Sequence, residues 1–400
     1  MEAYKIVKSI KNYLYTIILI VLLMLSACAQ GQEHSSTSLL HTEQTGYTEK
    51  TKHTEDTKHT EDYKYTEDTD NVEYTEHTEP TEHTGQIYLY GEIHGVAKIL
   101  DKEFELWCDY YQNDNMRNLF VEHGYFTAEF LNLWMQSDND AILDELYNDL
   151  EGTPSYNNDS KEFYKRIKSS CPETVFHGTD VGHQYYTTGE RYLKYLRKNG
   201  MKDSEQYKLA QDAIQQGEFY YENQDDVYRE NMMVKNFRRE FDSLDGESIM
   251  GIYGAAHTGL DAMDFTNRVP CMANKLQDLY GSIIHSEDLS GLVNEPVRVD
   301  TIEINGKNYI ASYFGKDNIG WSTDYIYREF WRLENAYDDF KENPKTENVL
   351  PYNNYIMDVE TGQVFVIDYT KTDGSVVREF HRSDGCKWQG KPCTEEFYVK

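Results

Sequence analysis

Cysteine is scarce in this chain of 400 residues, and its six cysteines form no C-x-x-C motif. That absence argues against a cysteine-rich zinc site, a thioredoxin-type redox centre and C-x-x-C-H haem attachment. The sequence also lacks a G-x-S-x-G nucleophile elbow, an H-E-x-x-H zinc motif, a Walker loop and a G-x-G-x-x-G dinucleotide loop. The enzyme classes that depend on these motifs are therefore set aside.

Positive charge is also in short supply, since 39 Lys and Arg stand against 70 Asp and Glu and the net charge is −31. Such an acidic chain repels phosphates, so we expect no nucleic-acid partner. After residue 28 the chain has no apolar stretch long enough to span a bilayer. Any attachment to a membrane must therefore come from the first residues.

Residues 1–28 have the order of a bacterial lipoprotein signal peptide. Three lysines (Lys5, Lys8 and Lys11) precede a mostly apolar stretch from Tyr13 to Met24, and Leu25-Ser26-Ala27-Cys28 resembles a lipobox. The resemblance implies that Cys28 is the lipid anchor, with palmitate or a similar chain, and becomes the new N-terminus. We therefore expect a lipoprotein on the extracellular face of the bacterial membrane. An ordinary signal peptide or an uncleaved anchor is the alternative.

Residues 29–85 repeat a unit close to (His/Tyr)-Thr-Glu-x-Thr and contain few apolar side chains. Such a composition cannot offset the entropy of ordering, so we expect a disordered Thr/Glu/His-rich tether. Six of the 13 histidines lie between His34 and His83, and a metal-gathering role is an alternative to a plain linker.

From residue 86 apolar runs alternate with helical patterns, which predicts an α/β domain over 86–291. We expect a mainly parallel sheet with helical layers, and a helical cap formed by the long segments after the second and third strands. The predicted strands are Gln86–Ile93, Asn118–Glu122, Thr174–Asp180, Ser248–Ala256 and Ser282–His285.

The pattern changes near residue 292, and residues 292–400 are expected to form an α+β extension. Strands are predicted at Val297–Ile304, Tyr309–Phe314 and Val364–Tyr369, with an aromatic-rich helix at Tyr325–Phe340. Cys386 and Cys393 flank a short segment and are candidates for a disulfide. Without Cys28 the cysteine count is odd, which leaves at least one free or intermolecular thiol.

Polar side chains stand at the ends of four predicted strands, each after an apolar run. Because residues i and i+2 of a strand share a face, Glu92 and His94 should project together. Glu122 and His257 end the second and fourth strands, and the third ends near His177 and Asp180. The ends of parallel strands meet at one sheet edge, so we expect a shared polar cleft there. The alternative is a set of strand-end histidines that only satisfy local hydrogen bonds.

A helical segment supplies a further candidate. Arg229, Met233 and Asn236 lie on one face by their i, i+4, i+7 spacing. Arg229 would stabilise an anionic intermediate or orient a cleft carboxylate. A surface salt bridge beside a buried methionine is the simpler interpretation of the spacing.

Four short motifs together resemble the superfamily that joins erythromycin esterases, ChaN-like haem-uptake lipoproteins and TraB/Tiki proteins. They are Gly91-Glu92-Ile93-His94, the strand-end Glu122, Arg229-Glu230-x-x-Met233 and Gly254-Ala255-Ala256-His257. The resemblance covers about residues 86–285 and implies an α/β fold with a helical cap and a cleft at the strand ends. The erythromycin esterase motif places its histidine one residue later than His94.

Members of this superfamily differ in activity, so the resemblance implies more than one function. Tiki-like proteins are metal-dependent proteases, which implies His94, His257 and either Glu122 or Glu92 as functional residues. Erythromycin esterases activate water with histidine and glutamates, and ChaN-like proteins bind haem.

Our leading hypothesis is a surface-anchored hydrolase with Glu92, His94, Glu122, Arg229 and His257 as site residues. A divalent Mn, Co or Zn ion would be held by His94, His257 and Glu122, and the substrate would be a small molecule or a peptide. The alternative is a non-catalytic lipoprotein that binds haem or another small ligand, with His94, His257 or Tyr253 as axial ligands. A surface adhesin with a degenerate fold is a third hypothesis, and the oligomeric state is left open.

Overall fold

The structure is a computed structural model that describes residues 84–153, 155–319 and 322–399. The expected signal peptide and Cys28 lie outside the described residues, as does nearly all of the expected tether. Among the described residues, no helix is both long enough and apolar enough to pass through a membrane.

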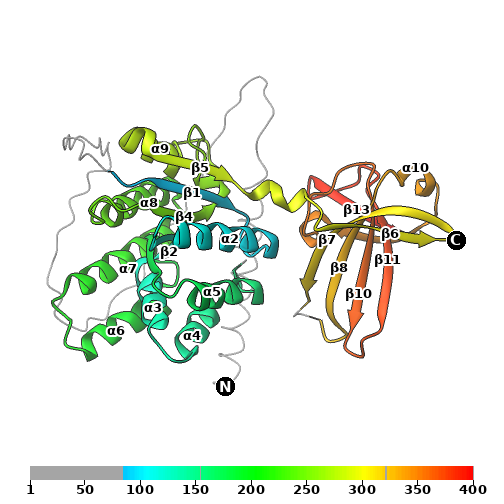
Figure 1. Cartoon of the computed structure of the whole chain (residues 1–400). Helices are drawn as coiled ribbons and strands as arrows, with labels where there is room; N and C mark the ends of the chain where they lie inside the picture. The colour runs from blue at the N-terminus through cyan, green and yellow to red at the C-terminus, as the bar shows by residue number, and fades with distance from the viewer. Residues whose placement is uncertain (1–83, 154, 320–321, 400) are drawn as a thin grey trace, which may run out of the picture. The chain divides into compact units, whose positions relative to one another are not determined.

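Five strands form an all-parallel sheet in the order β3-β2-β4-β1-β5, and helices alternate with them along the chain (Figure 1). The α/β class predicted from the sequence is confirmed. The strands are β1 (Ile87–Glu92), β2 (Asn118–Gly124), β3 (Val175–Asp180), β4 (Ile249–Gly254) and β5 (Ile284–Asp288). The helices are α2 (Ala97–Asn113), α3 (Tyr125–Met135), α4 (Ala141–Asp149), α5 (Asn158–Ser170), α6 (Glu190–Lys198), α7 (Glu205–Asn223), α8 (Asp226–Phe241) and α9 (Met272–Tyr280).

Apolar side chains leave both faces of this sheet, which explains its helical layers. On β1, Leu89 packs in a buried cluster with residues of α8 and α9, whereas Tyr90 packs in a second cluster with residues of α2 to α7. Neighbouring strand residues point to opposite faces, so each face buries its own cluster. A strand buried on both sides reads as a continuous apolar run, as the sequence of β4 does.

Helix α7 packs closely on the segment that follows β3. The Gly182 amide donates to the carbonyl of Ala213 at 3.1 Å. A Cβ atom at Gly217 would lie 2.1 Å from the Gly182 carbonyl oxygen, so only glycine allows this approach. The helix therefore covers the carboxyl end of β3, as expected of a helical cap.

The last part of the chain forms an eight-stranded sheet whose pairings are antiparallel. Its path runs β12-β13-β11-β10-β8-β7-β6, and β9 pairs with β13. The strands are β6 (Arg298–Ile304), β7 (Lys307–Asn318), β8 (Tyr325–Leu333), β9 (Lys345–Pro351), β10 (Val364–Lys371), β11 (Val376–Arg382), β12 (Lys387–Trp388) and β13 (Lys391–Phe397). The parallel sheet ends with β5 and the antiparallel sheet begins with β6, on either side of the boundary expected near residue 292. The limits of the two domains stay predictions.

The helix predicted at Tyr325–Phe340 is wrong. Strand β8 occupies Tyr325–Leu333, and only the four residues of α10 (Tyr337–Phe340) are helical. The segment is rich in Tyr, Phe, Trp and Ile, which favour strands, and it pairs on both sides with β7 and β10. These long-range pairings decide its conformation.

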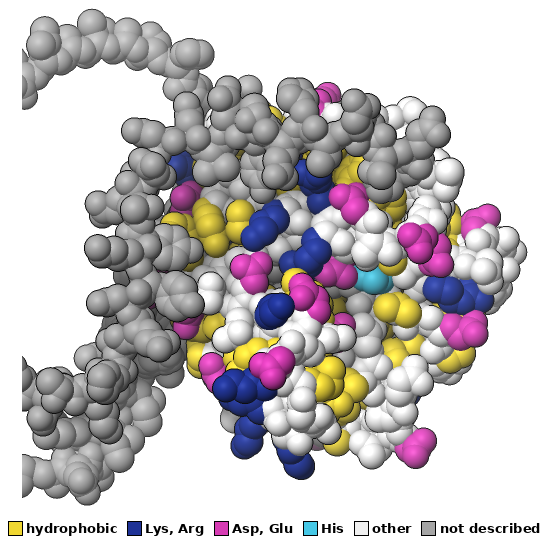
Figure 2. All heavy atoms as spheres, turned by 90° about the vertical axis from the view of Figure 1, so that its left-hand side faces the viewer, with side chains coloured by type: hydrophobic (Ala, Val, Ile, Leu, Met, Phe, Trp, Pro, Cys, Tyr) yellow, Lys and Arg dark blue, Asp and Glu magenta, His cyan; other side chains and the backbone are white. Residues whose placement is uncertain are grey.

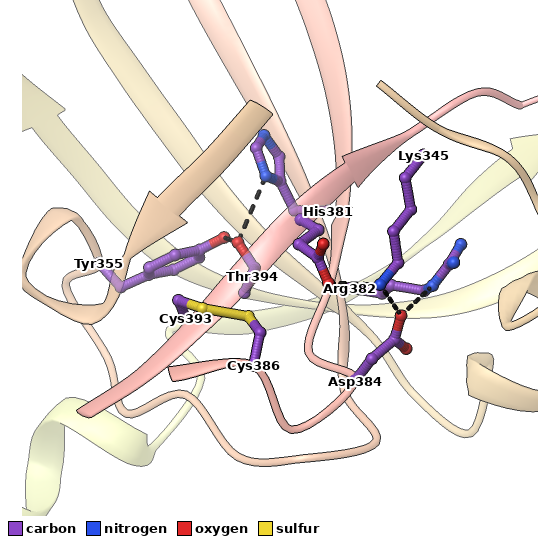
Figure 3. Close-up of a disulfide and its surroundings, with 9 residues drawn as sticks. Lys345, Tyr355, His381, Arg382, Asp384, Cys386, Cys393 and Thr394 are labelled. Carbon is purple, nitrogen blue, oxygen red and sulfur yellow. Dashed lines mark hydrogen bonds and ion pairs between the residues drawn. A yellow bond between two sulfur atoms is a disulfide. The ribbon is translucent and has the colours of Figure 1, made fainter. Parts of the chain in front are cut away.

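Cys386 and Cys393 form a disulfide, as the sequence suggested (Figure 3). It joins the segment before β12 to β13. Next to it, the Tyr355 hydroxyl lies 2.6 Å from the hydroxyl of Thr394, which lies 3.3 Å from Nδ1 of His381. Cys108, Cys171 and Cys271 are free thiols.

Candidate active site

The ends of β1, β2 and β4 bring together the residues predicted from the sequence. These strands are neighbours in the order β2-β4-β1, with Glu92 opposite Gly254 in the register. His94 follows β1 after one residue, and His257 ends the short 3-10 turn η2 (Ala255–His257) that follows β4. The parallel arrangement therefore places both histidines beside Glu122 of β2.

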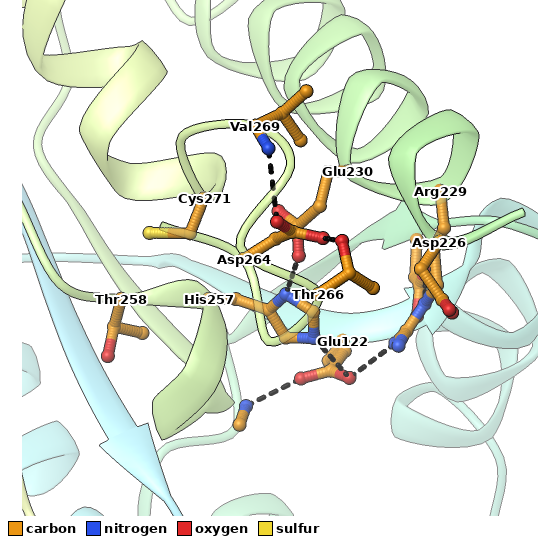
Figure 4. Close-up of polar contacts among 12 residues, drawn as sticks. Glu122, Asp226, Arg229, Glu230, His257, Thr258, Asp264, Thr266, Val269 and Cys271 are labelled. Atoms are coloured by element: carbon orange, nitrogen blue, oxygen red, sulfur yellow. Dashed lines mark hydrogen bonds and ion pairs between the residues drawn. The ribbon is translucent and has the colours of Figure 1, made fainter. Parts of the chain in front are cut away.

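Glu122 is the centre of the cluster, and both histidines direct Nε2 toward one of its oxygens. His94 Nε2 lies 3.7 Å and His257 Nε2 lies 3.6 Å from Oε1 of Glu122. The other oxygen, Oε2, accepts the backbone N–H of Gly254 at 2.5 Å (Figure 4). The Nε2–Oε1 separations are longer than a normal hydrogen bond, so these contacts are electrostatic pairings of imidazole and carboxylate.

Each histidine also has a carboxylate at its Nδ1 atom. His94 Nδ1 donates to Oε1 of Glu92 at 2.7 Å. His257 Nδ1 donates to Oε1 of Glu230 on α8 (Figure 4). This arrangement fixes the orientation of the ring and stabilises its protonated form, as in a His–carboxylate dyad. The sequence motif contained Glu230, but we assigned it no role, because a helix position cannot be placed beside a strand end from spacing alone.

Arg229, whose side chain is 14% exposed, lies between two carboxylates and does not form a surface salt bridge. Its Nη2 donates to Glu122 Oε1 and to Asp180 Oδ2, both at 2.6 Å, and its Nε donates to Asp180 Oδ1 at 3.1 Å. Asp180, at the end of β3, also bonds His183 Nε2 at 2.7 Å. The cation thus links the third strand end to Glu122.

His177 lies apart from this cluster. Its Nδ1 contacts Glu240 and its Nε2 contacts Asn118, each at 3.0 Å. Alternation along β3 explains the difference, because His177 and Asp180 are three residues apart and point to opposite faces. Tyr253 is fully buried and its hydroxyl bonds Thr179 at 2.7 Å, so its contacts are to the core.

Each charged group of the cluster stabilises the ionised form of its neighbours. Burial would raise the pKa of Glu122, but the charges of His257, His94 and Arg229 hold it well below its usual value. Burial would likewise lower the pKa of His94, but Glu122 and Glu92 raise it well above the ordinary value. The pKa of His257 is also raised, by Glu122 and Glu230 against the effect of burial. Glu122 is therefore a fixed anion facing two imidazoles that favour protonation.

Solvent reaches the cluster from the His94 side. The side chain of His94 is 35% exposed, whereas those of His257 and Glu122 are 6% and 9% exposed. A substrate would therefore meet His94 first.

A buried carboxyl group interacts electrostatically with Glu92 and His94. Glu103 of α2 is fully buried, and neither of its oxygens has a hydrogen-bond partner in the described part of the chain. Burial, reinforced by the charge of Glu92, raises the pKa of Glu103 well above its usual value. Glu103 therefore favours its neutral acid form in the folded chain. It occupies the apolar face of a helix, a position that sequence patterning assigns to the core.

The cluster contains ligand types that a divalent metal accepts, but its ion pairing does not favour one. Two imidazole Nε2 atoms and a carboxylate suit Zn, and carboxylates at Nδ1 are common around such sites. However, Arg229 already donates to the oxygen that the metal would share. In the described ranges no group of three or more His, Cys, Asp or Glu is arranged to hold a metal ion. Metal binding and haem binding both stay predictions.

No protein-family model matches the chain, and no curated protein matches it. Solved structures that resemble it include a mutant of the erythromycin esterase EreC in its open conformation, at 11% identity and a TM-score of 0.40, over 57% of this chain and 76% of that one. A protein from Bacillus cereus aligns at 13% identity and a TM-score of 0.40, over 79% of this chain and 86% of that one. A succinoglycan biosynthesis protein aligns at 13% identity and a TM-score of 0.39, over 57% of this chain and 70% of that one. Likenesses this distant show neither a family nor an activity.

Proposed function

We propose that this chain is a hydrolase in which His94 activates water. The observation that carries the proposal is the pair of His–carboxylate dyads, His94–Glu92 and His257–Glu230, that face one oxygen of Glu122. Two such dyads around a fixed anion are costly to bury, and acid–base catalysis gives them a use.

His94 is suited to be the general base because its ring is the more exposed of the two. Its neutral form would take a proton from water at Nε2 while Glu92 stabilises the imidazolium that forms. Because the pKa of His94 is raised, this base becomes available toward alkaline pH.

His257 is suited to the opposite role. Its raised pKa favours the protonated ring, in which Nε2–H is a donor for the oxygen that gains charge during hydrolysis. Glu230 holds this orientation. Arg229 acts mainly as a positioning residue, because its Nη2 and Nε atoms are used on Glu122 and Asp180, and a direct contact with an oxyanion stays a prediction.

The substrate class is proposed as a small-molecule or peptide ester or amide. Figure 2 shows one face of the molecule, on which hydrophobic, acidic and basic side chains are mixed. The candidate site itself contains both carboxylates and cationic groups, so its charge does not select among these substrates.

The test is hydrolysis of 4-nitrophenyl acetate and of a quenched fluorescent peptide library by the purified full chain. We expect His94→Ala and His257→Ala to lower kcat/KM by about 10²-fold or more while their circular dichroism stays that of the parent. His285→Ala is the matched control, because this exposed histidine of β5 bonds Gln86 at 3.1 Å and stacks on Tyr88 but contacts no residue of the cluster. Turnover that persists in either site variant would refute the assignment.

We also propose that the protein is a lipoprotein anchored through Cys28 at the extracellular face of the membrane. The order of lysines, apolar stretch and lipobox-like residues supports this. Cys28→Ser should abolish metabolic labelling with an alkyne-tagged palmitate and shift the protein out of the membrane fraction. Labelling that survives the substitution would contradict the anchor.

A further inference from the structure

Two of the three free thiols in the described part of the chain lie against each other. Cys108 is on α2, and Cys171 is the residue that follows the last turn of α5. Their Sγ atoms are 3.5 Å apart. Sulfur atoms in a disulfide are about 2.05 Å apart, so a movement of roughly 1.5 Å would join them.

The surroundings hold the two cysteines in this position. The indole N–H of Trp107, next to Cys108, donates to the Thr174 hydroxyl at 3.0 Å. That hydroxyl donates in turn to the carbonyl oxygen of Cys171 at 2.7 Å, and the Cys171 N–H donates to Ile167 at 2.7 Å. The Trp107 side chain of α2 is therefore linked through Thr174 to the Cys171 backbone independently of the sulfurs, which helps to keep the two thiols together.

We propose that Cys108 and Cys171 are the site of a second disulfide, formed when the chain meets a disulfide-donating oxidant. Cys386 and Cys393 are already joined, so the chain carries one cross-link that requires oxidising surroundings. The inference does not depend on the proposed hydrolase activity.

The reaction is thiol–disulfide exchange with a small disulfide such as oxidised glutathione. Cys108 is half-buried and Cys171 is fully buried, so the thiolate of Cys108 attacks first and releases one glutathione thiol. The Cys171 thiolate then attacks the mixed disulfide and releases the second. Two protons and two electrons leave the protein, and one glutathione disulfide becomes two thiols.

The second step should be slow near neutral pH. Burial and the adjacent Cys108 sulfur raise the pKa of the Cys171 thiol to about 12. Below that pH the thiolate fraction of Cys171 grows about tenfold per pH unit, so ring closure should accelerate in proportion. Cys271 is buried and its Sγ is 3.1 Å from the Gly259 carbonyl, and we expect it to stay a thiol.

The experiment incubates the full chain with oxidised glutathione, blocks remaining thiols under denaturing conditions, and maps proteolytic peptides by mass spectrometry. We expect a peptide pair joined through Cys108 and Cys171, lighter by two hydrogens than the sum of the free peptides, with Cys271 alkylated. Finding Cys108 and Cys171 both alkylated after prolonged incubation at pH 9 would overturn the proposal. The experiment uses the unsubstituted chain, so its outcome does not depend on how any variant folds.

Thermal unfolding gives a second measurement. The oxidised parent should melt higher than the reduced parent by on the order of 5–10 °C, because the new bond closes a long loop of the unfolded chain. Cys271→Ser should keep this difference and Cys108→Ser should lose it. An equal difference in Cys108→Ser would show that the cross-link lies elsewhere.

Discussion

The two histidines of the candidate site differ in what surrounds them, and this difference assigns their roles. Both have a carboxylate at Nδ1 and both direct Nε2 at Glu122, but the side chain of His94 is 35% exposed and that of His257 is 6% exposed. The exposed ring can exchange a proton directly with water, whereas the buried ring is shielded from solvent and held by Glu230. Because both pKa values are raised, exposure rather than pKa distinguishes the base from the donor.

The pH dependence of hydrolysis should show the raised pKa of His94. Glu122 and Glu92 favour the imidazolium, so the neutral form of His94 appears at a higher pH than the ordinary pKa of histidine would give. The rising limb of kcat/KM against pH should therefore be shifted toward alkaline pH. Glu92→Gln removes one negative charge, which lowers the pKa of His94, so the limb should move to lower pH and the plateau should fall. NMR titration of His94 checks the same shift without turnover. An unmoved limb would show that another group is the base.

Glu103 offers a prediction about stability. Its pKa in the folded chain is raised by burial, so the native state keeps a proton that the unfolded chain releases above its usual pKa of 4.5. The unfolded state then binds fewer protons, and stability falls as pH rises between these two pKa values. Glu103→Gln cannot ionise and should melt higher than the parent at pH 7–8, by roughly 2–4 °C per kcal/mol gained. Near pH 4 the two proteins should have similar melting temperatures, and a constant difference at all pH values would contradict this account.

At the scale of elements, the sequence predicted the parallel sheet and the strand ends that build the site. The carboxyl ends of parallel strands lie at one edge of the sheet. Knowing which apolar runs end in polar residues is therefore enough to predict that Glu92, Glu122, Asp180 and His257 meet there. The sequence did not identify Glu230 or Glu103 as site neighbours, since their positions depend on how α8 and α2 pack on the sheet. It also failed at β8, where pairing with two neighbouring strands outweighed a helix-like pattern.

Strand β4 contains two glycines, of which Gly254 faces the candidate site and Gly251 faces the core. A Cβ atom at Gly254 would lie 3.2 Å from His94 Nε2 and 3.3 Å from Glu122 Oε2, whereas one at Gly251 would lie 2.7 Å from a methyl carbon of Leu89. Gly254→Ala should therefore reduce turnover by crowding the site, with little change in melting temperature. Gly251→Ala should instead destabilise the core by about 1–3 kcal/mol through overpacking.

Gly291→Ala serves as the control for both variants, because a Cβ atom there meets nothing within 4 Å. Activity and chemical denaturation are measured for all three proteins. If Gly254→Ala lost stability and kept its specific activity, the crowding argument would be wrong.

A measurement of metal content reports on the whole molecule, and two histidine-containing parts of the chain are candidates for binding a cation. One is the histidine-rich segment between His34 and His83, and the other is the cluster of His94, His257 and Glu122. At the cluster, Mn, Co or Zn would have to compete with the protons that the raised pKa values favour on both imidazoles, and to share an oxygen with Arg229. Any uptake there would consequently increase with pH.

Elemental analysis of the full chain, purified without chelator, distinguishes metal bound at the histidine-rich segment from metal bound at the cluster. We expect the metal content of His94→Ala/His257→Ala to equal that of the parent, and turnover by the parent to survive treatment with EDTA. A variant in which His53 and His59 are alanine tests the tether by the same measurement. Near-stoichiometric metal that disappears only in His94→Ala/His257→Ala, together with loss of turnover in EDTA, would instead assign water activation to a metal held by His94, His257 and Glu122.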